Sequence, residues 1–271
     1  MSVNKEIKRI TTETLRKMKF EGDKISMLTA YDFTMATLVD QAGTEVILVG
    51  DSAANVMAGH ETTLPITLDQ MIYHAQCVVR GAKRALVVVD LPFGTYQSDP
   101  QKALESAVRI MKESGAHAIK LEGGEEVAES IRRIVNAGIP VMGHLGLTPQ
   151  SIYQFGSYKV RAKDEAEADK LINDAKLLEE LGCFSLVMEK IPAELATKVT
   201  QAISIPTIGI GAGNGTDGQV LVVHDMLGLN NEFKPKFVRK YLNLEDQITQ
   251  AIGQYVTDVK SSDFPNANEQ Y

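Results

Sequence analysis

Short apolar runs alternate with longer amphipathic segments along most of the chain. The apolar runs are rich in β-branched residues and predict eight strands, at residues 25–29, 46–49, 85–89, 118–121, 139–142, 184–188, 207–210 and 220–223. Between most of them apolar residues recur at helical spacing, which predicts helices at residues 33–41, 68–80, 100–114, 125–136, 165–181 and 193–202. A strand followed by a helix is therefore the repeating unit.

Glycines stand where several of the expected helices end. Each expected helix end before a strand carries one, as a left-handed C-terminal cap requires: Gly43, Gly81, Gly115, Gly138 and Gly182. Runs that are apolar throughout, such as residues 86–89, suit parallel strands covered by helices on both faces. Eight such units in one series predict a single (β/α)8 TIM barrel with a short N-terminal helix at residues 12–19 and a C-terminal helical extension. An open doubly wound sheet is the alternative.

Length and composition agree with one enzyme-sized domain. A chain of 271 residues is the usual size of an α/β barrel. No Pro- or Ser-rich linker interrupts residues 20–260, so we expect one domain over residues 1–271. Its core spans about residues 24–242, and the polar stretch 261–271 forms a frayed tail.

The charge balance narrows the possible partners. With 28 Lys and Arg against 35 Asp and Glu, the chain has no excess of cations for a broad nucleic-acid or membrane surface. Cys77 and Cys183 stand outside any CxxC pattern, which favours a reduced, intracellular protein. We find neither a secretory signal pattern nor the roughly 20 apolar residues of a membrane span. The expected location is the cytoplasm.

Chemically capable residues follow the expected strands. They are Asp32, Asp51, Ser52, Asp90, Lys120, Glu122, His144, Glu189, the glycines 209, 211 and 213, His224 and Asp225. In a closed barrel the carboxyl ends of all strands meet at one mouth, where barrel enzymes keep their active sites. Any one of these residues could instead enter a loop or cap a helix, and Asp32 is placed to be the N-cap of the helix at residues 33–41.

Asp51 and Asp90 are the most informative pair. Two carboxylates at separate strand ends, with no Cys or His pair nearby, favour a hard cation such as Mg²⁺ over zinc. Mg²⁺ takes one or two protein carboxylates and leaves its other positions to water and substrate. Glu122 is a candidate third ligand, directly or through water.

Lys120 and Glu189 suggest how a substrate would be handled. Lys120 offers a cation for an anionic substrate, and its structural alternative is an ion pair with Glu122 or a neighbouring Asp. Glu189 stands at a mostly apolar strand end, a setting that suits a general base acting on a carbon acid. Its structural alternative is an ion pair with Lys190.

A glycine-rich stretch at residues 209–215 resembles a dinucleotide-binding loop but does not fit one. The GxGxxG spacing would need glycine at Asn214 or Thr216, and a strand follows before any full helix. We interpret this stretch as a tight turn at the mouth of the barrel.

Several motifs, in this order and spacing, closely resemble the 3-methyl-2-oxobutanoate hydroxymethyltransferase (ketopantoate hydroxymethyltransferase) family. They are Gly50-Asp51-Ser52, Asp90-Leu-Pro-Phe93, Lys120-Leu-Glu-Gly-Gly124, Gly143-His-Leu-Gly-Leu-Thr-Pro-Gln150, and Ile208-Gly-Ile-Gly-Ala-Gly-Asn214 with Thr216-Asp-Gly-Gln219. The resemblance extends from about Lys24 to Leu242.

This resemblance implies a specific reaction. The family transfers a hydroxymethyl group from 5,10-methylenetetrahydrofolate to 3-methyl-2-oxobutanoate, giving 2-dehydropantoate for pantothenate biosynthesis by Mg²⁺-assisted enolisation and aldol-like addition. By the same resemblance one Mg²⁺ per subunit is held by Asp51 and Asp90, with Glu122 as an additional contact. A homo-oligomer, a decamer in many members, is also implied.

The resemblance also assigns the residues around the substrate. Asp51, Ser52, Asp90, Lys120 and His144 match positions at the keto acid, and Glu189 matches the proton acceptor. The sequence departs from the family at two places. It has Ala53-Ala54-Asn55 where Leu-Gly-Met is common, and Lys190 where a small or apolar residue is usual.

Two other functions are compatible with parts of the pattern. A Mg²⁺-dependent lyase or mutase of the phosphoenolpyruvate or 2-oxo acid type would use the same site, although a phosphorylated substrate would require more cations than Lys120 alone. A non-enzymatic oligomeric scaffold would be expected to have lost some of Asp51, Asp90, Lys120 or Glu189, and all four are present.

Overall fold

Eight parallel strands close into a barrel in strict chain order, β1 to β8, which confirms the predicted (β/α)8 barrel. The structure is a computed structural model that describes residues 8–230 and 234–271. The strands are β1 (Ile25–Thr29), β2 (Val46–Val49), β3 (Leu86–Asp90), β4 (Ala118–Lys120), β5 (Val141–Gly146), β6 (Ser185–Glu189), β7 (Thr207–Ile210) and β8 (Gly218–Leu221). Closure comes from the parallel pairing of β1 with β8, in which Met27 lies opposite Val220.

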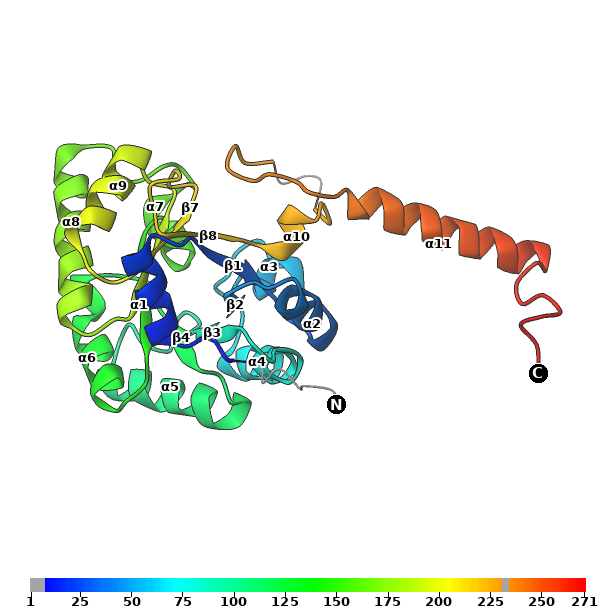
Figure 1. The fold of residues 1–271 in the computed structure, drawn as a ribbon, viewed down its shortest axis with the longest axis horizontal. Coiled ribbons are helices and arrows are strands. Elements are labelled where there is room, and N and C mark those ends of the chain that lie inside the picture. The colour runs from blue at the N-terminus through cyan, green and yellow to red at the C-terminus, as the bar shows by residue number, and fades with distance from the viewer. Residues whose placement is uncertain (1–7, 231–233) are drawn as a thin grey trace. The chain divides into compact units, whose positions relative to one another are not determined.

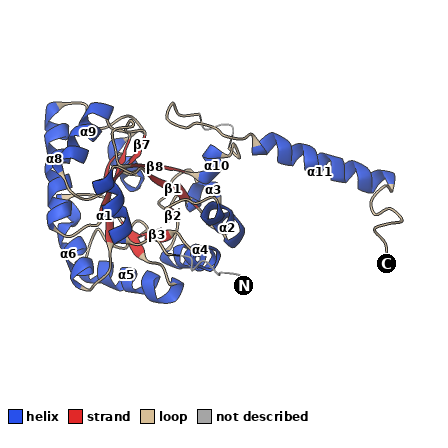
Figure 2. Ribbon diagram, viewed as in Figure 1, coloured by secondary structure: helices blue, strands red, loops and turns tan. Residues whose placement is uncertain are grey.

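Helices surround the strands (Figures 1 and 2). They are α1 (Thr12–Glu21), α2 (Phe33–Gln41), α3 (Ala53–Val56), α4 (Leu68–Gly81), α5 (Pro100–Ser114), α6 (Ala128–Asn136), α7 (Ile152–Phe155), α8 (Glu165–Glu180) and α9 (Ala193–Ala202), with 3-10 turns at Glu125–Val127 and Pro149–Ser151. Residues 211–217, between β7 and β8, form no helix, as the analysis of the glycine-rich stretch predicted.

The barrel interior is filled with apolar side chains. The core cluster takes residues from every strand, among them Met27, Val88, Met142 and Ile208. Leu15 of α1 belongs to the same cluster and is fully buried. Since Lys19 of α1 donates to Asp217, which precedes β8, α1 lies at the amino-terminal end of the barrel. That leaves the carboxyl end of the strands for the polar residues.

Several predicted boundaries differ from the structure. The fifth strand is Val141–Gly146 and not residues 139–142. The last strand is Gly218–Leu221 and not residues 220–223, because Gly218 pairs with Ile25. A Cβ on Gly218 would lie 2.4 Å from the Ile25 carbonyl oxygen, so the strand begins at a residue that no apolar pattern reveals. Gly81 is the last residue of α4 and not a left-handed cap, whereas Gly115 is a cap with φ of 76°.

The chain divides into two compact units, Met1–Leu221 and Val222–Tyr271. All eight strands lie in the first, so the expected core of residues 24–242 extends past its end. The second unit contains α10 (Val223–Met226) and α11 (Leu244–Ser261). Within residues 8–230 and 234–271, no helix combines the length and the apolar character needed to cross a membrane.

Candidate active site

The period of two along a strand directs polar side chains into the mouth of the barrel. Three buried polar residues each lie two positions beyond a residue of the core cluster: Asp90 after Val88, Lys120 after Ala118, and His144 after Met142. Side chains two apart on a strand point the same way, so all three face the interior at the carboxyl ends of β3, β4 and β5.

Asp51, Asp90 and Lys120 form the centre of this site. Lys120 Nζ lies 2.9 Å from Asp90 Oδ1, and each side chain is 4% exposed. The amide of Asp51, directly after β2, donates to Asp90 Oδ2 at 3.0 Å. The ion pair that was the structural alternative for Lys120 is therefore present, with Asp90, while the side chain stays in the mouth of the barrel.

Burial and crowding of like charge destabilise the ionised carboxylates. Loss of water and the nearby charges of Asp90 and Glu122 raise the pKa of Asp51 to about 8. Burial also raises the pKa of Asp90, against the opposing effect of Lys120. Burial alone would discharge Lys120, but Asp90 and Glu122 outweigh it and raise the pKa of the ammonium group. The site is therefore short of positive charge.

His144 connects two further carboxylates. Its Nδ1 lies 3.3 Å from Glu122 Oε1, and its Nε2 lies 3.4 Å from Glu189 Oε2. Burial and the Lys120 charge oppose protonation of His144, but the two carboxylates outweigh them and raise its pKa to about 9. Burial likewise opposes ionisation of Glu122, yet its contacts with His144 and Lys120 lower its pKa. Glu122 is thus a stable anion beside an imidazolium.

Glu189 is the most accessible carboxylate of the group. Its side chain is 16% exposed, whereas that of Glu122 is 3% exposed. Glu189 is the last residue of β6. A group that exchanges a proton with a bound substrate needs this access, so the position fits the role expected of Glu189.

Ser52 lies beside the same cluster. Its hydroxyl is 2.8 Å from the hydroxyl of Tyr31, a fully buried side chain after β1. Gly50 makes the tight approach possible, because a Cβ at this position would lie 2.8 Å from Ser52 Oγ. Asp51, Ser52, Asp90, Lys120, Glu122, His144 and Glu189 are thus brought together at one end of the barrel.

Two other expected site residues are explained by local structure. Asp32 is the N-cap of α2 and accepts a 2.9 Å hydrogen bond from the amide of Met35, which confirms the capping alternative. His224 and Asp225 were expected at the end of the last strand, but they lie in α10. Asp225 is buried, and this burial raises its pKa to about 6, with Lys240 opposing the shift.

The two departures from the family pattern have local consequences. Ala54 lies in the short helix α3, a conformation that needs no glycine. Lys190 adopts the left-handed region with φ of 45°, unusual for a side chain of this kind, and its Nζ donates to the carbonyl oxygen of Tyr158. Lys190 therefore ties the loop after β5 to the end of β6, next to Glu189.

Gln150 and Tyr96 were not expected in the site. Gln150 follows β5 and donates from Nε2 to Asp51 Oδ2 at 2.8 Å. The hydroxyl of Tyr96 donates to Gln150 Oε1 at 2.7 Å and accepts from the amide of Glu122 at 3.1 Å. Both residues lie in loops, without strand periodicity to direct them. Only the position of Gln150 at the end of a motif singled it out.

The donor set fits a divalent cation. Among the described residues, Asp90 Oδ1 and His144 Nε2 are buried and make no hydrogen bond, and their charged neighbours are Lys120 and Glu189. Carboxylates outnumber cationic groups here, and carboxylate oxygens are the ligands that Mg²⁺ prefers. No set of three His, Cys, Asp or Glu side chains among the described residues is arranged to hold a metal by itself. Mg²⁺ commonly takes only one or two protein carboxylates and completes its coordination with water and substrate.

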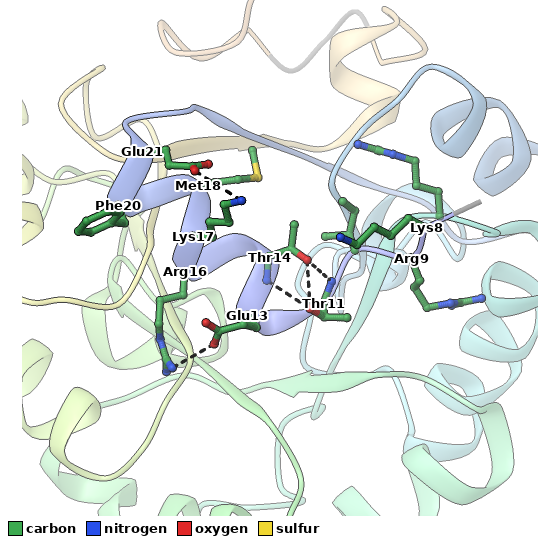
Figure 3. A pocket seen from close by; sticks show the side chains of 12 residues that line it. Lys8, Arg9, Thr11, Glu13, Thr14, Arg16, Lys17, Met18, Phe20 and Glu21 are labelled. Atoms are coloured by element: carbon green, nitrogen blue, oxygen red, sulfur yellow. Dashed lines mark hydrogen bonds and ion pairs between the residues drawn. The ribbon is translucent and has the colours of Figure 1, made fainter. Parts of the chain in front are cut away.

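A second hollow lies beside α1 (Figure 3). It has a volume of about 830 Å³, and its charged residues are largely paired, Arg16 with Glu13 at 3.3 Å and Lys17 with Glu21 at 3.5 Å. It contains none of the residues that gather at the carboxyl ends of the strands. This hollow is therefore separate from the candidate active site.

Comparison with known proteins identifies full-length relatives of this chain. The family described as Ketopantoate hydroxymethyltransferase matches residues 9–267. The 3-methyl-2-oxobutanoate hydroxymethyltransferase of Flavobacterium johnsoniae is 73% identical over 270 residues, which cover 100% of this chain and 99% of that protein. The enzyme of the same name from Christiangramia forsetii is 70% identical over 272 residues, covering 100% of both.

Among solved structures, the phosphoenolpyruvate phosphomutase from Streptomyces platensis subsp. rosaceus superposes with a TM-score of 0.63 at 12% identity. The match covers 93% of this chain and 88% of that one. At this identity the likeness shows the fold alone.

Proposed function

The chain belongs to the ketopantoate hydroxymethyltransferase family, and from that membership we propose that it transfers a hydroxymethyl group from 5,10-methylenetetrahydrofolate to 3-methyl-2-oxobutanoate. The product is 2-dehydropantoate, a precursor in pantothenate biosynthesis. The observation that carries the proposal is the gathering of Asp51, Asp90, Lys120 and Glu189 at the barrel mouth of a chain with full-length relatives of that name.

Asp51 and Asp90 would hold one Mg²⁺ per subunit, and Glu122 would contact it directly or through water. When bound, the cation supplies Lewis-acid polarisation of the substrate carbonyl. Burial raises the pKa of both carboxyl groups, so a cation that binds their ionised forms would take the place of a proton there.

Ser52, Lys120 and His144 would bind the keto acid. The carboxylate of 3-methyl-2-oxobutanoate needs hydrogen-bond donors, and the ammonium of Lys120 and the imidazolium of His144 are both buried donors at the mouth. Because Lys120 is already paired with Asp90 at 2.9 Å, its position is fixed before substrate arrives. The residues thus orient the substrate without any need for a Schiff base.

Glu189 would remove the proton from C3 of the substrate. The electron pair of that C–H bond becomes part of the enolate, whose C3 then bonds to the methylene carbon carried by tetrahydrofolate. Both C–N bonds of that carbon break, and water supplies the hydroxyl group that remains on it. The proton taken from C3 and the second proton of water go to the two nitrogens of the departing tetrahydrofolate. A positioned base contributes about 10²–10⁴-fold to such a step.

The proposed oligomeric state and cellular location are taken from the family resemblance. We propose a homo-oligomer, with a decamer as the number of subunits that the resemblance implies, acting in the cytoplasm on small-molecule substrates. The excess of acidic over basic residues supports the absence of a nucleic-acid partner.

Proton exchange in D₂O tests the first half of the reaction. NMR should show the C3 proton of 3-methyl-2-oxobutanoate exchanging when protein and Mg²⁺ are present, without folate. EDTA should abolish the exchange. Exchange that proceeds at the same rate in EDTA would contradict the proposed role of the metal.

A further inference from the structure

Gln150 occupies a buried position between the ends of four strands. It lies in the 3-10 turn Pro149–Ser151, directly after β5, and is 6% exposed. Its side-chain amide and its backbone amide together contact residues that follow β2, β3 and β4. A polar side chain this deeply buried must have its hydrogen bonds satisfied, so its contacts define its orientation.

The amide of Gln150 is fully hydrogen-bonded, in one orientation only. Oε1 accepts from the hydroxyl of Tyr96 at 2.7 Å and from Nε2 of Gln97 at 2.9 Å. Nε2 donates to Asp51 Oδ2 at 2.8 Å and to the carbonyl oxygen of Leu91 at 3.0 Å. A flipped amide would place its oxygen against the Leu91 carbonyl oxygen and against ionised Asp51, so the orientation with Nε2 toward Asp51 is the one that satisfies all four contacts.

Tyr96 keeps this arrangement in place. Burial and the charge of Glu122 raise the pKa of Tyr96 well above its usual value, so its hydroxyl stays protonated and donates to Gln150. The same hydroxyl oxygen accepts from the amide of Glu122. Tyr96 therefore connects Gln150 to the segment that follows β4.

Gln150 also contacts Glu122, the additional carboxylate beside the proposed metal. Its backbone amide donates to Glu122 Oε2 at 3.0 Å. One residue therefore fixes one oxygen of Asp51 and one oxygen of Glu122. Hydrogen bonds from residues that contact the metal ligands, but not the metal, orient metal-binding carboxylates. Their removal typically weakens metal binding by about 10–100-fold.

Residue chemistry at position 150 is narrowly restricted. A glutamate would add another carboxylate beside Asp51 and Glu122, in a site already crowded with negative charge. A leucine of similar size would leave Asp51 Oδ2 and the Leu91 carbonyl without their donor. Only a neutral amide supplies two donors on one side and two acceptor positions on the other.

We propose that Gln150 is a positioning residue whose side-chain amide, held by Tyr96, fixes the Asp51 carboxylate in the orientation that binds a divalent cation. This inference rests on the proposed function, because it takes Asp51 as a metal ligand. Gln150 touches neither the metal nor the keto acid in this assignment, and acts through Asp51.

Metal affinity in the absence of substrate tests this role directly. Binding of Mn²⁺ as a probe would be measured by electron paramagnetic resonance, with Mg²⁺ competition, for the full-length wild type, Gln150→Leu, Tyr96→Phe and Asp51→Asn. We expect Gln150→Leu to weaken binding by about 10–100-fold. Tyr96→Phe, which removes one of the two donors to Oε1, should weaken it less.

Gln154→Leu is the matched control, since Gln154 is exposed on α7 in the same loop. It should bind Mn²⁺ as the wild type does. Circular dichroism and thermal unfolding would establish that each variant is folded, and Tyr96→Phe, which keeps the ring volume, tests the same connection if Gln150→Leu does not fold.

The possible results test the proposed metal site and the positioning role of Gln150 separately. If the wild type fails to bind Mn²⁺, the proposed metal function is wrong. If the wild type binds and Asp51→Asn does not, while folded Gln150→Leu and Tyr96→Phe both bind with unchanged affinity, the positioning role of Gln150 is wrong.

Discussion

Asp51 is the residue at which burial has the clearest chemical consequence. In the metal-free protein, burial and the neighbouring Asp90 and Glu122 raise its pKa to about 8, far above the 3.8 of a free aspartate. Between these two values the native state holds a proton that the unfolded state has released. Stability therefore falls as pH rises through this interval, because the unfolded state binds fewer protons.

This fall in stability with rising pH predicts how Mg²⁺ should stabilise the protein. A cation that binds ionised Asp51 competes with the proton, so the rise in melting temperature on adding Mg²⁺ should be larger at pH 8.5 than at pH 6. Thermal unfolding with and without Mg²⁺ across this range measures it. Asp51→Asn should make the difference small at every pH; a Mg²⁺ effect independent of pH would contradict the coupling to this carboxyl group.

Glu189 can be tested apart from metal binding. Replacing it by Gln keeps the size of the side chain but removes the proton acceptor, so we expect C3 exchange to fall by about 10²–10⁴-fold. Binding of Mn²⁺ should change little, because Glu189 contacts His144 and not the two aspartates. Exchange at the parent rate in Glu189→Gln would show that another group is the base.

Close packing of α4 against α2 explains why residue 81, at the end of α4, is a glycine. A Cβ on Gly81 would lie 2.6 Å from the carbonyl oxygen of Phe33 and 3.0 Å from Ala36 Cβ, both in α2. The sequence pattern suggested a left-handed cap at this position, but the requirement is close contact between two helices. A glycine pattern alone does not separate these two causes, because both select for the missing side chain.

Gly81→Ala should therefore destabilise the protein, by about 1–3 kcal/mol from overpacking. Gly253→Ala is the matched control. Gly253 lies in α11 with nothing within 4 Å of an added Cβ, so alanine should stabilise the helix by about 0.5–1 kcal/mol. Urea unfolding of both variants measures the contrast, and equal effects of the two substitutions would argue against the steric explanation.

The helix α11 presents an apolar face without burying any residue. The exposed residues recur at helical spacing, and they are Ile248, Ile252, Tyr255, Val256 and Val259. A continuous apolar face of this kind is typical of a surface that another protein surface covers. If that cover is a second copy of the chain, the face contributes to the proposed homo-oligomer.

Ile252→Asp should then lower the molecular mass measured by light scattering after size exclusion. Gln250→Asp places the same charge on the opposite side of α11 and should leave the mass unchanged. An Ile252→Asp protein of parent mass and lower melting temperature would instead show that the face packs within one subunit.

On the scale of the whole molecule, hydrophobic periodicity predicted eight parallel strands in series, although it was the polar residues at the strand ends that favoured a closed barrel over an open sheet. It also placed Asp90, Lys120 and His144 correctly, since strand geometry directs their side chains. The contributions of Gln150 and Tyr96 could not be predicted in this way. Their positions depend on loops whose backbone follows no repeating pattern, and on hydrogen bonds between segments distant in sequence.

The transfer of one labelled carbon tests the proposed reaction most directly. The protein would be incubated with Mg²⁺, 3-methyl-2-oxobutanoate and 5,10-methylenetetrahydrofolate carrying ¹³C in its methylene group, and the mixture followed by ¹³C NMR. The label should appear in the hydroxymethyl carbon of 2-dehydropantoate, and only when all components are present. Failure of the folded, Mg²⁺-loaded protein to move the label, with conversion of a phosphoenolpyruvate-type substrate instead, would contradict the assignment.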